Sequence, residues 1–317
     1  MYFEYFGLLV ASLGLGASAA VLPRQGSVHL AVSPTCGTLS GSPASINAGL
    51  NDLSSYKTIV AFGDSYTSGG TDGTTLPPAI MTPPNPSAGG RVSNGKLWIE
   101  HLANAAGATL HDYAVNGSVI DALEYPSGSV VRNAKDYMSQ VDSYLSDHPK
   151  SDPDTTLYVV FVGMGDFENR DELVFQNFSL TTGAITYSIA ELTSGSDLSK
   201  HFLFVDNYGR GQKTSDGEVY KQALFNNLKD AKNQLGISFG FVDLYPLWNG
   251  VLGSNPGYEA FGFTSPGSCT VNDQTTDGAC EDPEHTFYWI PGHPSASTHS
   301  ITAQYVQEAM SECNLDQ

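Results

Sequence analysis

Strand-length apolar runs that alternate with helical patterns are the feature that most constrains the fold of this 317-residue chain. The runs contain few polar positions, as expected of strands that are buried on both faces. This alternation predicts a parallel sheet with helices on both sides, in one three-layer α/β/α sandwich. The expected strands are 57–63, 109–115, 156–163, 201–206 and 238–243, and the expected helices are 97–106, 131–146, 180–194, 218–235 and 298–310.

The first residues of the chain are typical of an export signal. In "YFGLLVASLGLGASAA" an apolar stretch leads to Ala17-Ser18-Ala19, a pattern of small residues at a cleavage site. A membrane anchor is the alternative, but the stretch is shorter than the roughly 20 residues that a membrane span needs. We therefore expect residues 1–20 to be a signal peptide, 21–55 an N-terminal wrapping segment and 56–317 the functional domain of a secreted, extracellular protein.

The chain is strongly acidic, with 33 Asp and Glu against 14 Lys and Arg and a formal charge of -19. Binding to nucleic acid requires a basic face, so this charge argues against a nucleic-acid partner. Beyond the first twenty residues no segment is long and apolar enough to cross a bilayer, which predicts no stable membrane insertion. We expect a monomer whose partner is a small substrate.

The four cysteines fit an exported protein. Cys269 and Cys280 bracket a polar loop, "CTVNDQTTDGAC", and are expected to form a local disulfide, whereas Cys36 and Cys313 are available for a second one. A metal site is the alternative, but no Cys-x-x-Cys or His-x-x-x-His spacing supports it. The sequence therefore predicts no metal and no cofactor. Of the two sequons, the one at Asn177 is the expected glycosylation site.

The segment "TIVAFGDSYTSGG" places a serine where the first predicted strand ends. In an open parallel sheet, ligands bind at the carboxyl ends of the strands, so Ser65 is positioned to meet a substrate. The neighbouring glycines allow a sharp turn and a close approach. The alternative is a serine that merely caps a helix or stabilises a turn.

Further motifs follow Ser65 in a fixed order: "GGRVSNGKLWIEHLA" (89–103), "YAVNGS" (113–118), a glycine motif after the third strand, and "WIPGHP" (289–294). Together they resemble the SGNH/GDSL hydrolases, and in particular the secreted fungal acetylesterases of carbohydrate-esterase family sixteen. The resemblance spans about residues 57–310 and marks residues 56–317 as an SGNH/GDSL hydrolase domain. It implies a flavodoxin-like sheet and hydrolysis of short-chain acyl esters, often on carbohydrates, without a cofactor.

The same resemblance assigns roles to individual residues. Ser65 would be the nucleophile and His293 the general base. The backbone N–H groups of Ser65 and Gly117 would bind the oxyanion. Three residues would support the site. They are Asp64, which would organise the turn, Asn116, whose place at the site would leave its sequon unused, and Asp166. His299 is expected to be structural.

Two positions depart from the family pattern. Gly165 stands where the family has an asparagine that donates to the oxyanion, and Ile290 stands where it has an aspartate that orients the base. A backbone carbonyl near Ile290 could orient His293 instead, as in the Ser–His dyads that some of these enzymes resemble. If the two departures limit activity, Ile290→Asp should raise turnover and Gly165→Asn should add to it. Other replacements are Asn169 or Asn116 as a donor, and Asp282 or Glu284 as an acid.

Three functional hypotheses follow from these residues. The first is a secreted serine esterase that cleaves short, acetyl-type esters. The second is a catalytically impaired binding protein on the same fold, which retains the cleft. The third is a lipase or phospholipase of the same superfamily, although the Pro-rich segment 71–90 lacks the apolar character of a lid over bulk lipid. That segment is expected either to be a solvent-facing wrap or to wall the acyl pocket.

Overall fold

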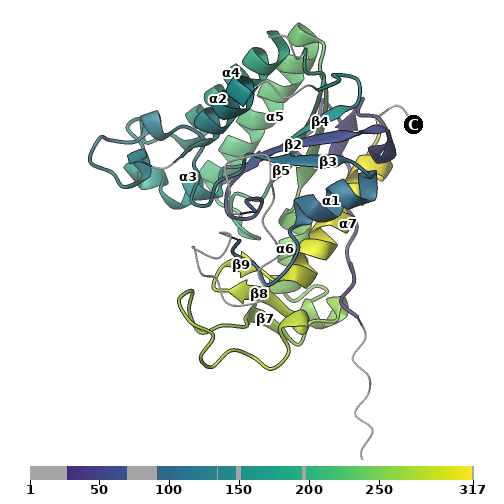
Figure 1. Ribbon diagram of the computed structural model, residues 1–317, viewed down its shortest axis with the longest axis vertical. Coiled ribbons are helices and arrows are strands. Elements are labelled where there is room, and N and C mark those ends of the chain that lie inside the picture. Colours follow the sequence, from purple (N-terminus) through teal and green to yellow (C-terminus); the bar gives the residue numbers. More distant parts are fainter. Residues whose placement is uncertain (1–26, 70–90, 134, 148–150, 195–197, 316–317) are drawn as a thin grey trace, which may run out of the picture.

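A computed structural model describes residues 27–69, 91–133, 135–147, 151–194 and 198–315 (Figure 1). The expected signal peptide, residues 1–20, and the Pro-rich segment 71–90 lie outside these described residues. No helix among the described residues combines the length and the apolar character that a membrane crossing requires.

The centre of the molecule is a six-stranded sheet with the order β1-β6-β5-β4-β2-β3. Five strands are parallel, and β1 pairs with β6 in the antiparallel direction. All five strands expected from the sequence are present, so the predicted three-layer α/β/α fold is confirmed. The strands are β1 (Ile46–Ala48), β2 (Thr58–Gly63), β3 (Thr109–Asp112), β4 (Thr156–Phe161), β5 (His201–Asp206) and β6 (Ser238–Asp243).

Helices cover both faces of this sheet, and Figure 1 shows the two helical layers with the sheet between them. One layer contains α2 (Tyr137–Asp147), α4 (Thr182–Ser194) and α5 (Ser215–Leu235). The other contains α1 (Trp98–Ala106), α6 (Tyr245–Leu252) and α7 (Ala296–Glu312). The short helix α3 (Met164–Glu168) follows β4.

Two apolar cores result, one on each face of the sheet. Along β2, Val60 and Phe62 belong to the core under α2, α4 and α5, whereas Ile59 and Ala61 belong to the core under α1, α6 and α7. Successive side chains of a strand point to opposite faces, so a strand covered on both sides must be apolar at every position. This is why the strands could be found in the sequence as continuous apolar runs.

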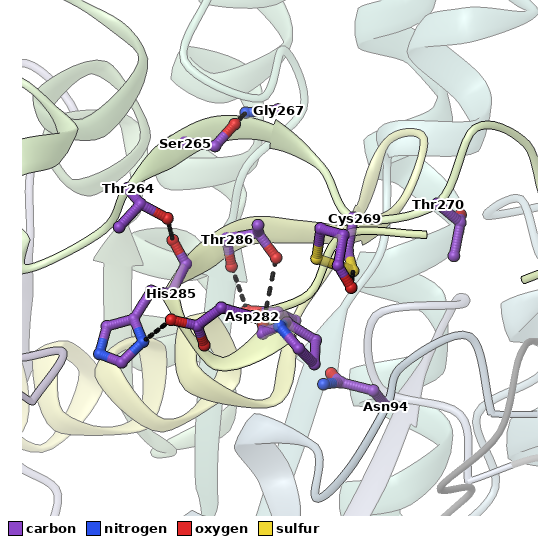
Figure 2. Close-up of a disulfide and its surroundings, with 12 residues drawn as sticks. Asn94, Thr264, Ser265, Gly267, Cys269, Thr270, Asp282, His285 and Thr286 are labelled. Carbon is purple, nitrogen blue, oxygen red and sulfur yellow. Dashed lines mark hydrogen bonds and ion pairs between the residues drawn. A yellow bond between two sulfur atoms is a disulfide. The ribbon is translucent and has the colours of Figure 1, made fainter. Parts of the chain in front are cut away.

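A second, three-stranded sheet lies below the main one and was not predicted. It consists of β7 (Ser265–Ser268), β8 (Thr286–Ile290) and β9 (His293–Pro294), in the order β7-β8-β9 (Figure 1). Strands as short as "SPGS" and "HP" show no apolar alternation that a pattern could detect. Cys269 and Cys280 form the expected local disulfide beside this sheet (Figure 2).

The two ends of the described chain are joined. Cys36 and Cys313 form the second disulfide, which links the N-terminal segment to the end of α7. Asn47 in β1 donates its backbone N–H to the carbonyl of Cys313 at 2.7 Å and its side-chain amide to the carbonyl of Met310 at 2.8 Å. The segment expected to wrap the domain thus supplies an edge strand of the main sheet.

Aspartates gather at the carboxyl edge of the main sheet. Asp112 ends β3, Asp64 follows β2, and Asp166 lies in α3, directly after β4. All three side chains are buried. Burial disfavours the charged form, and it raises the pKa of Asp64 and Asp166 to about 7 and that of Asp112 to about 8.

These raised pKa values predict that stability falls as the pH rises from 6.5 to 8. An unfolded carboxyl group has a pKa of about 3.9, so in this window the folded chain binds more protons than the unfolded chain and loses them as the pH rises. Urea denaturation should show a decrease on the order of 2 kcal/mol in the free energy of unfolding.

Buried histidines have the opposite effect on stability, and it is greatest at and below the lower end of this window. Burial lowers the pKa of His299 to about 3. Because an unfolded histidine titrates at about 6.5, this group costs stability as the pH falls through that value. The variant Asp112→Asn removes one titrating carboxyl, so its free energy of unfolding should decrease less between pH 6.5 and 8 than that of the wild type. A free energy of unfolding that stays constant or rises across the window would contradict the assignment.

Candidate active site

The turn that carries Ser65 is organised by the aspartate before it. The Asp64 side chain accepts the backbone N–H of Tyr66 at 3.0 Å, and its carbonyl accepts the N–H of Ser68 at 2.9 Å. Asp64 is 3% exposed, so it lies beneath the turn. The hydroxyl of Ser65 is left half-buried at the end of β2.

Ser65 and His293 meet although 228 positions separate them in the chain. The Nε2 atom of His293 lies 3.1 Å from Ser65 Oγ. The other ring nitrogen, Nδ1, lies 3.2 Å from the carbonyl oxygen of Pro291. A carbonyl can only accept, so Nδ1 carries the proton and Nε2 is free to accept the proton of the serine.

The environment of His293 favours a neutral imidazole. Burial is the largest effect and lowers the pKa, and the charge of Arg210 lowers it further. The hydrogen bond to Pro291 and the charge of Asp273 act in the opposite direction. The net shift is downward, so at neutral pH the ring has the protonation state that a general base needs.

The "RVSNGKLW" segment joins the serine turn to the histidine segment. Asn94 accepts the backbone N–H of Ala296 at 2.8 Å, just after His293 in the chain. Trp98 donates its indole N–H to Thr67 at 3.2 Å and its backbone N–H to His299 Nδ1 at 3.2 Å. His299 therefore caps α1 from a buried position and makes this structural contact rather than one with Ser65.

Two backbone donors proposed for the oxyanion are available. The N–H groups of Ser65 and Gly117 donate no hydrogen bond to any of the residues that the structure describes. Gln140 ties their two segments together, because it exchanges hydrogen bonds of 2.9 Å with both backbone groups of Gly63 and donates to Ser118 Oγ at 2.7 Å. Gln140 was not predicted from the sequence, since a glutamine in a helix has no distinguishing local signal.

Asp166 supports the loop that follows Gly117. Its carboxyl accepts the backbone N–H of Ile120 at 2.9 Å and the hydroxyl of Tyr125 at 3.1 Å. The side chain is fully buried and has no role at the surface of the site. Asp166 thus braces the loop that carries one of the candidate oxyanion donors.

Gly165 is required by close packing. A Cβ atom at this position would lie 2.7 Å from the carbonyl oxygen of Ser118, closer than real Cβ atoms approach backbone. The neighbouring candidate donor is also engaged elsewhere, because Asn169 donates its side-chain amide to the carbonyl of Gly165 at 2.8 Å. Asn116 is exposed in the turn before Gly117.

Ile290 is 2% exposed and packs in an apolar cluster with Cys269 and Trp289. Asp282, one of the acids considered as its replacement, does not reach His293. Figure 2 shows the Asp282 carboxylate against His285, and its Oδ2 lies 2.8 Å from the Nδ1 atom of that ring. The partner of the His293 Nδ1 atom is therefore the backbone carbonyl of Pro291.

The remaining expected features lie away from Ser65. Asn177 is exposed, and its side-chain oxygen accepts the hydroxyl of Ser179 at 2.8 Å. Within the described part of the chain, no three or more His, Cys, Asp or Glu side chains lie together in a group that could hold a metal ion.

The sequence of this chain is similar to those of known proteins. The sequence model of the family "GDSL-like Lipase/Acylhydrolase" matches residues 59–306. An acetylesterase from Hypocrea jecorina is 32% identical over 110 residues, which are 32% of this chain and 30% of that protein. The chain therefore matches less than a third of the length of this relative.

Solved structures with similar backbones include carbohydrate esterases. One is a carbohydrate esterase family 2 enzyme with a carbohydrate-binding domain from Corynascus thermopiles (Myceliophthora fergusii), with a TM-score of 0.45 and 18% identity over 81% of this chain and 66% of that chain. Another is a family two carbohydrate esterase from Clostridium thermocellum in complex with cellohexaose, with a TM-score of 0.44 and 14% identity over 84% of this chain and 66% of that chain.

These TM-scores lie below 0.5, so the family assignment rests on the match to the family's sequence model, which covers most of the chain. The GDSL-type serine turn lies within the matched residues, as does the histidine that meets it. The chain belongs to the GDSL-like lipase/acylhydrolase family, a family of carboxylic ester hydrolases.

Proposed function

We propose that this protein is a secreted serine esterase that removes short acyl groups, in the first place acetyl groups on carbohydrates, with a Ser65–His293 dyad. The observation that carries the proposal is the chain of two contacts through the imidazole. Ser65 Oγ lies 3.1 Å from Nε2, and Nδ1 lies 3.2 Å from the carbonyl oxygen of Pro291. The nucleophile, the base and the orienting group are thus connected by successive hydrogen bonds.

In the proposed reaction, His293 Nε2 accepts the proton of Ser65 as Oγ attacks the ester carbonyl carbon. The carbonyl oxygen becomes an oxyanion and is bound by the N–H groups of Ser65 and Gly117. The bond to the alcohol breaks, and the alcohol leaves with the proton from Nε2. Water then attacks the acyl-serine with His293 as base, which releases the carboxylic acid and restores the serine.

The carbonyl of Pro291 replaces the missing carboxylate in holding the imidazole. It fixes the same tautomer, with the proton on Nδ1, but it supplies a dipole instead of a full negative charge. In a protease reference case, loss of the orienting carboxylate costs up to about 10⁴ in turnover, largely because the wrong tautomer forms. Here the tautomer is retained, so a smaller loss is expected than for a triad that has lost its acid.

The substrate class is supported by the curated relative, which is an acetylesterase, and secretion by the signal-like residues 1–20 and the two disulfides. Glycosylation at the exposed Asn177 is part of the same proposal. We propose a monomer with a small acyl ester or acetylated carbohydrate as its substrate. The wrapping segment 21–55 and the hydrolase domain 56–317 stay as predicted boundaries.

The dyad predicts covalent labelling of Ser65 by a fluorophosphonate probe. Ser65→Ala and His293→Ala should each abolish labelling and hydrolysis of p-nitrophenyl acetate. Matched controls are Ser194→Ala and His29→Ala, which remove an exposed serine and an exposed histidine remote from the site. Absence of labelling of the wild type from acidic to alkaline pH would favour the binding protein, and a preference for long-chain esters over acetate would favour the lipase.

The environment of His293 predicts activity in mildly acidic solution. A general base must be unprotonated, so kcat/KM should rise with pH through the pKa of His293 and then level off. Because burial lowers this pKa, the midpoint should lie below the usual histidine value of about 6.5. A pH–rate profile with p-nitrophenyl acetate measures it. A midpoint above that value would contradict a buried, neutral base.

The packing at Gly165 reverses the expectation that an asparagine there would help. Gly165→Ala and Gly165→Asn should both lower kcat by about tenfold or more, since any Cβ would displace Ser118 and with it the Gly117 donor. Gly183→Asn is the control, because a Cβ at Gly183 meets no atom within 4 Å. Higher turnover in Gly165→Asn would show that the loop can yield and that the missing donor limits the enzyme.

Ile290→Asp should not raise turnover either. The carboxylate would enter the apolar cluster with Cys269 and Trp289, where an unpaired charge is costly. Thermal unfolding of this variant should show a lower midpoint together with unchanged or lower kcat. A gain in kcat would mean that the new carboxylate replaces the carbonyl of Pro291 as the partner of Nδ1.

A further inference from the structure

The turn that carries His293 has no carboxylate to hold it, so its position depends on the backbone. The imidazole makes two hydrogen-bonding contacts, one with the carbonyl of Pro291 in its own turn and one with Ser65. A contact between residues only two positions apart moves with the turn and cannot by itself place the ring against Ser65. Another part of the protein must hold the turn.

Tyr66 makes that connection. Its hydroxyl donates to the carbonyl oxygen of Gly292 at 2.6 Å, and Gly292 is the residue between Pro291 and His293. Tyr66 directly follows Ser65, so this hydrogen bond ties the base's turn to the nucleophile's turn. The ring centroids of Tyr66 and His293 are 5.9 Å apart, which places the two rings in contact.

Packing keeps the Tyr66 ring in place. The side chain is 1% exposed and stacks on Trp248 with ring centroids 6.1 Å apart and an angle of 27° between the planes. Its other neighbour, Phe161, meets it edge-on at 5.9 Å. Trp248 is itself anchored, because its indole N–H donates to the hydroxyl of Tyr288 at 3.2 Å.

Arg210 extends the connection to α3. Its guanidinium forms an ion pair with Glu168, and its positive charge acts on the Tyr66 hydroxyl and lowers the pKa of that group. One of its nitrogens would lie 3.4 Å from a Cβ atom on Gly292, so the group also lies beside the turn. Burial raises the pKa of Tyr66 well above its usual value, which keeps the phenol protonated and able to donate.

We propose that Tyr66 is a positioning residue for His293, which holds the Pro291–His293 turn through the carbonyl of Gly292 and so performs the placement that a carboxylate at position 290 performs elsewhere. This inference rests on the proposed function. The hydrogen bond from Tyr66 fixes where the turn lies, and the carbonyl of Pro291 fixes which ring nitrogen carries the proton. The two backbone carbonyls together replace one side chain.

The test is the variant Tyr66→Phe, with Tyr305→Phe as a matched control. Tyr305 is also fully buried, and its hydroxyl also donates to a backbone carbonyl, that of Asp243 at 3.2 Å. Both variants keep the ring and lose one hydroxyl-to-carbonyl hydrogen bond. Thermal unfolding should therefore show similar, small losses in both proteins.

Turnover should distinguish Tyr66→Phe from Tyr305→Phe. Tyr66→Phe is expected to lower kcat on p-nitrophenyl acetate by about 10- to 100-fold with KM changed less than about twofold, because misplacement of a catalytic group affects the chemical step. Tyr305→Phe should keep kcat within about twofold of the wild type. If the wild type is active, equal kcat values in the two variants would overturn the inference.

A second readout does not depend on esterase activity. The ¹⁵N resonances of the His293 ring, assigned by comparison with His293→Gln, report which nitrogen carries the proton. All three proteins should show the tautomer protonated at Nδ1, because Pro291 moves together with the turn. The Nε2 resonance also responds to the hydrogen bond with Ser65, so it should be alike in the wild type and Tyr305→Phe and should move in Tyr66→Phe toward its position in Ser65→Ala.

The two readouts distinguish the failure of each proposal. A wild type that hydrolyses no ester, combined with the change of the Nε2 resonance in Tyr66→Phe, would end the proposed function and leave the positioning role supported. An unchanged Nε2 resonance in Tyr66→Phe, together with unchanged kcat or an inactive wild type, would overturn the positioning role.

Discussion

Burial of the central sheet on both faces is the constraint on which the other features of this protein depend. Helices cover the two faces, so only the ends of the strands remain open for chemistry. The apolar strand β2 therefore delivers Ser65 to an edge that is already lined by the ends of β3 and β4. Buried aspartates at that edge, among them Asp64 and Asp166, accept backbone N–H groups and shape the loops.

The site is assembled from loops that are braced against each other rather than from a triad of side chains. Gln140 connects the end of β2 with the loop after β3, and Asp166 connects that loop with α3. Close packing is the consequence, and it explains Gly165, where even one additional carbon atom would meet the carbonyl of Ser118. The close packing at this position therefore leaves no room for the asparagine of the family pattern.

His293, the proposed base, is held by a different means from the one that the family pattern suggests. An apolar side chain occupies position 290 and packs beside the Cys269–Cys280 disulfide, so the segment has become part of a small apolar core. The orienting partners of His293 are main-chain carbonyls, which need no particular side chain. A dipole in a rigid turn is weaker than a charge, and its usefulness depends on how firmly Tyr66 and its neighbours hold that turn.

The sequence by itself determined the parallel α/β architecture, the serine turn and the identity of the histidine, because continuous apolar runs and contiguous motifs are written locally in the chain. It also indicated both cysteine pairs. It did not reveal the small sheet β7-β8-β9, whose strands carry no apolar alternation. Only the tertiary structure decided what partners His293 and why Gly165 must lack a side chain. Both depend on the positions of backbone carbonyls in the folded chain. Every residue has the same carbonyl, so the sequence does not indicate which carbonyl makes the contact.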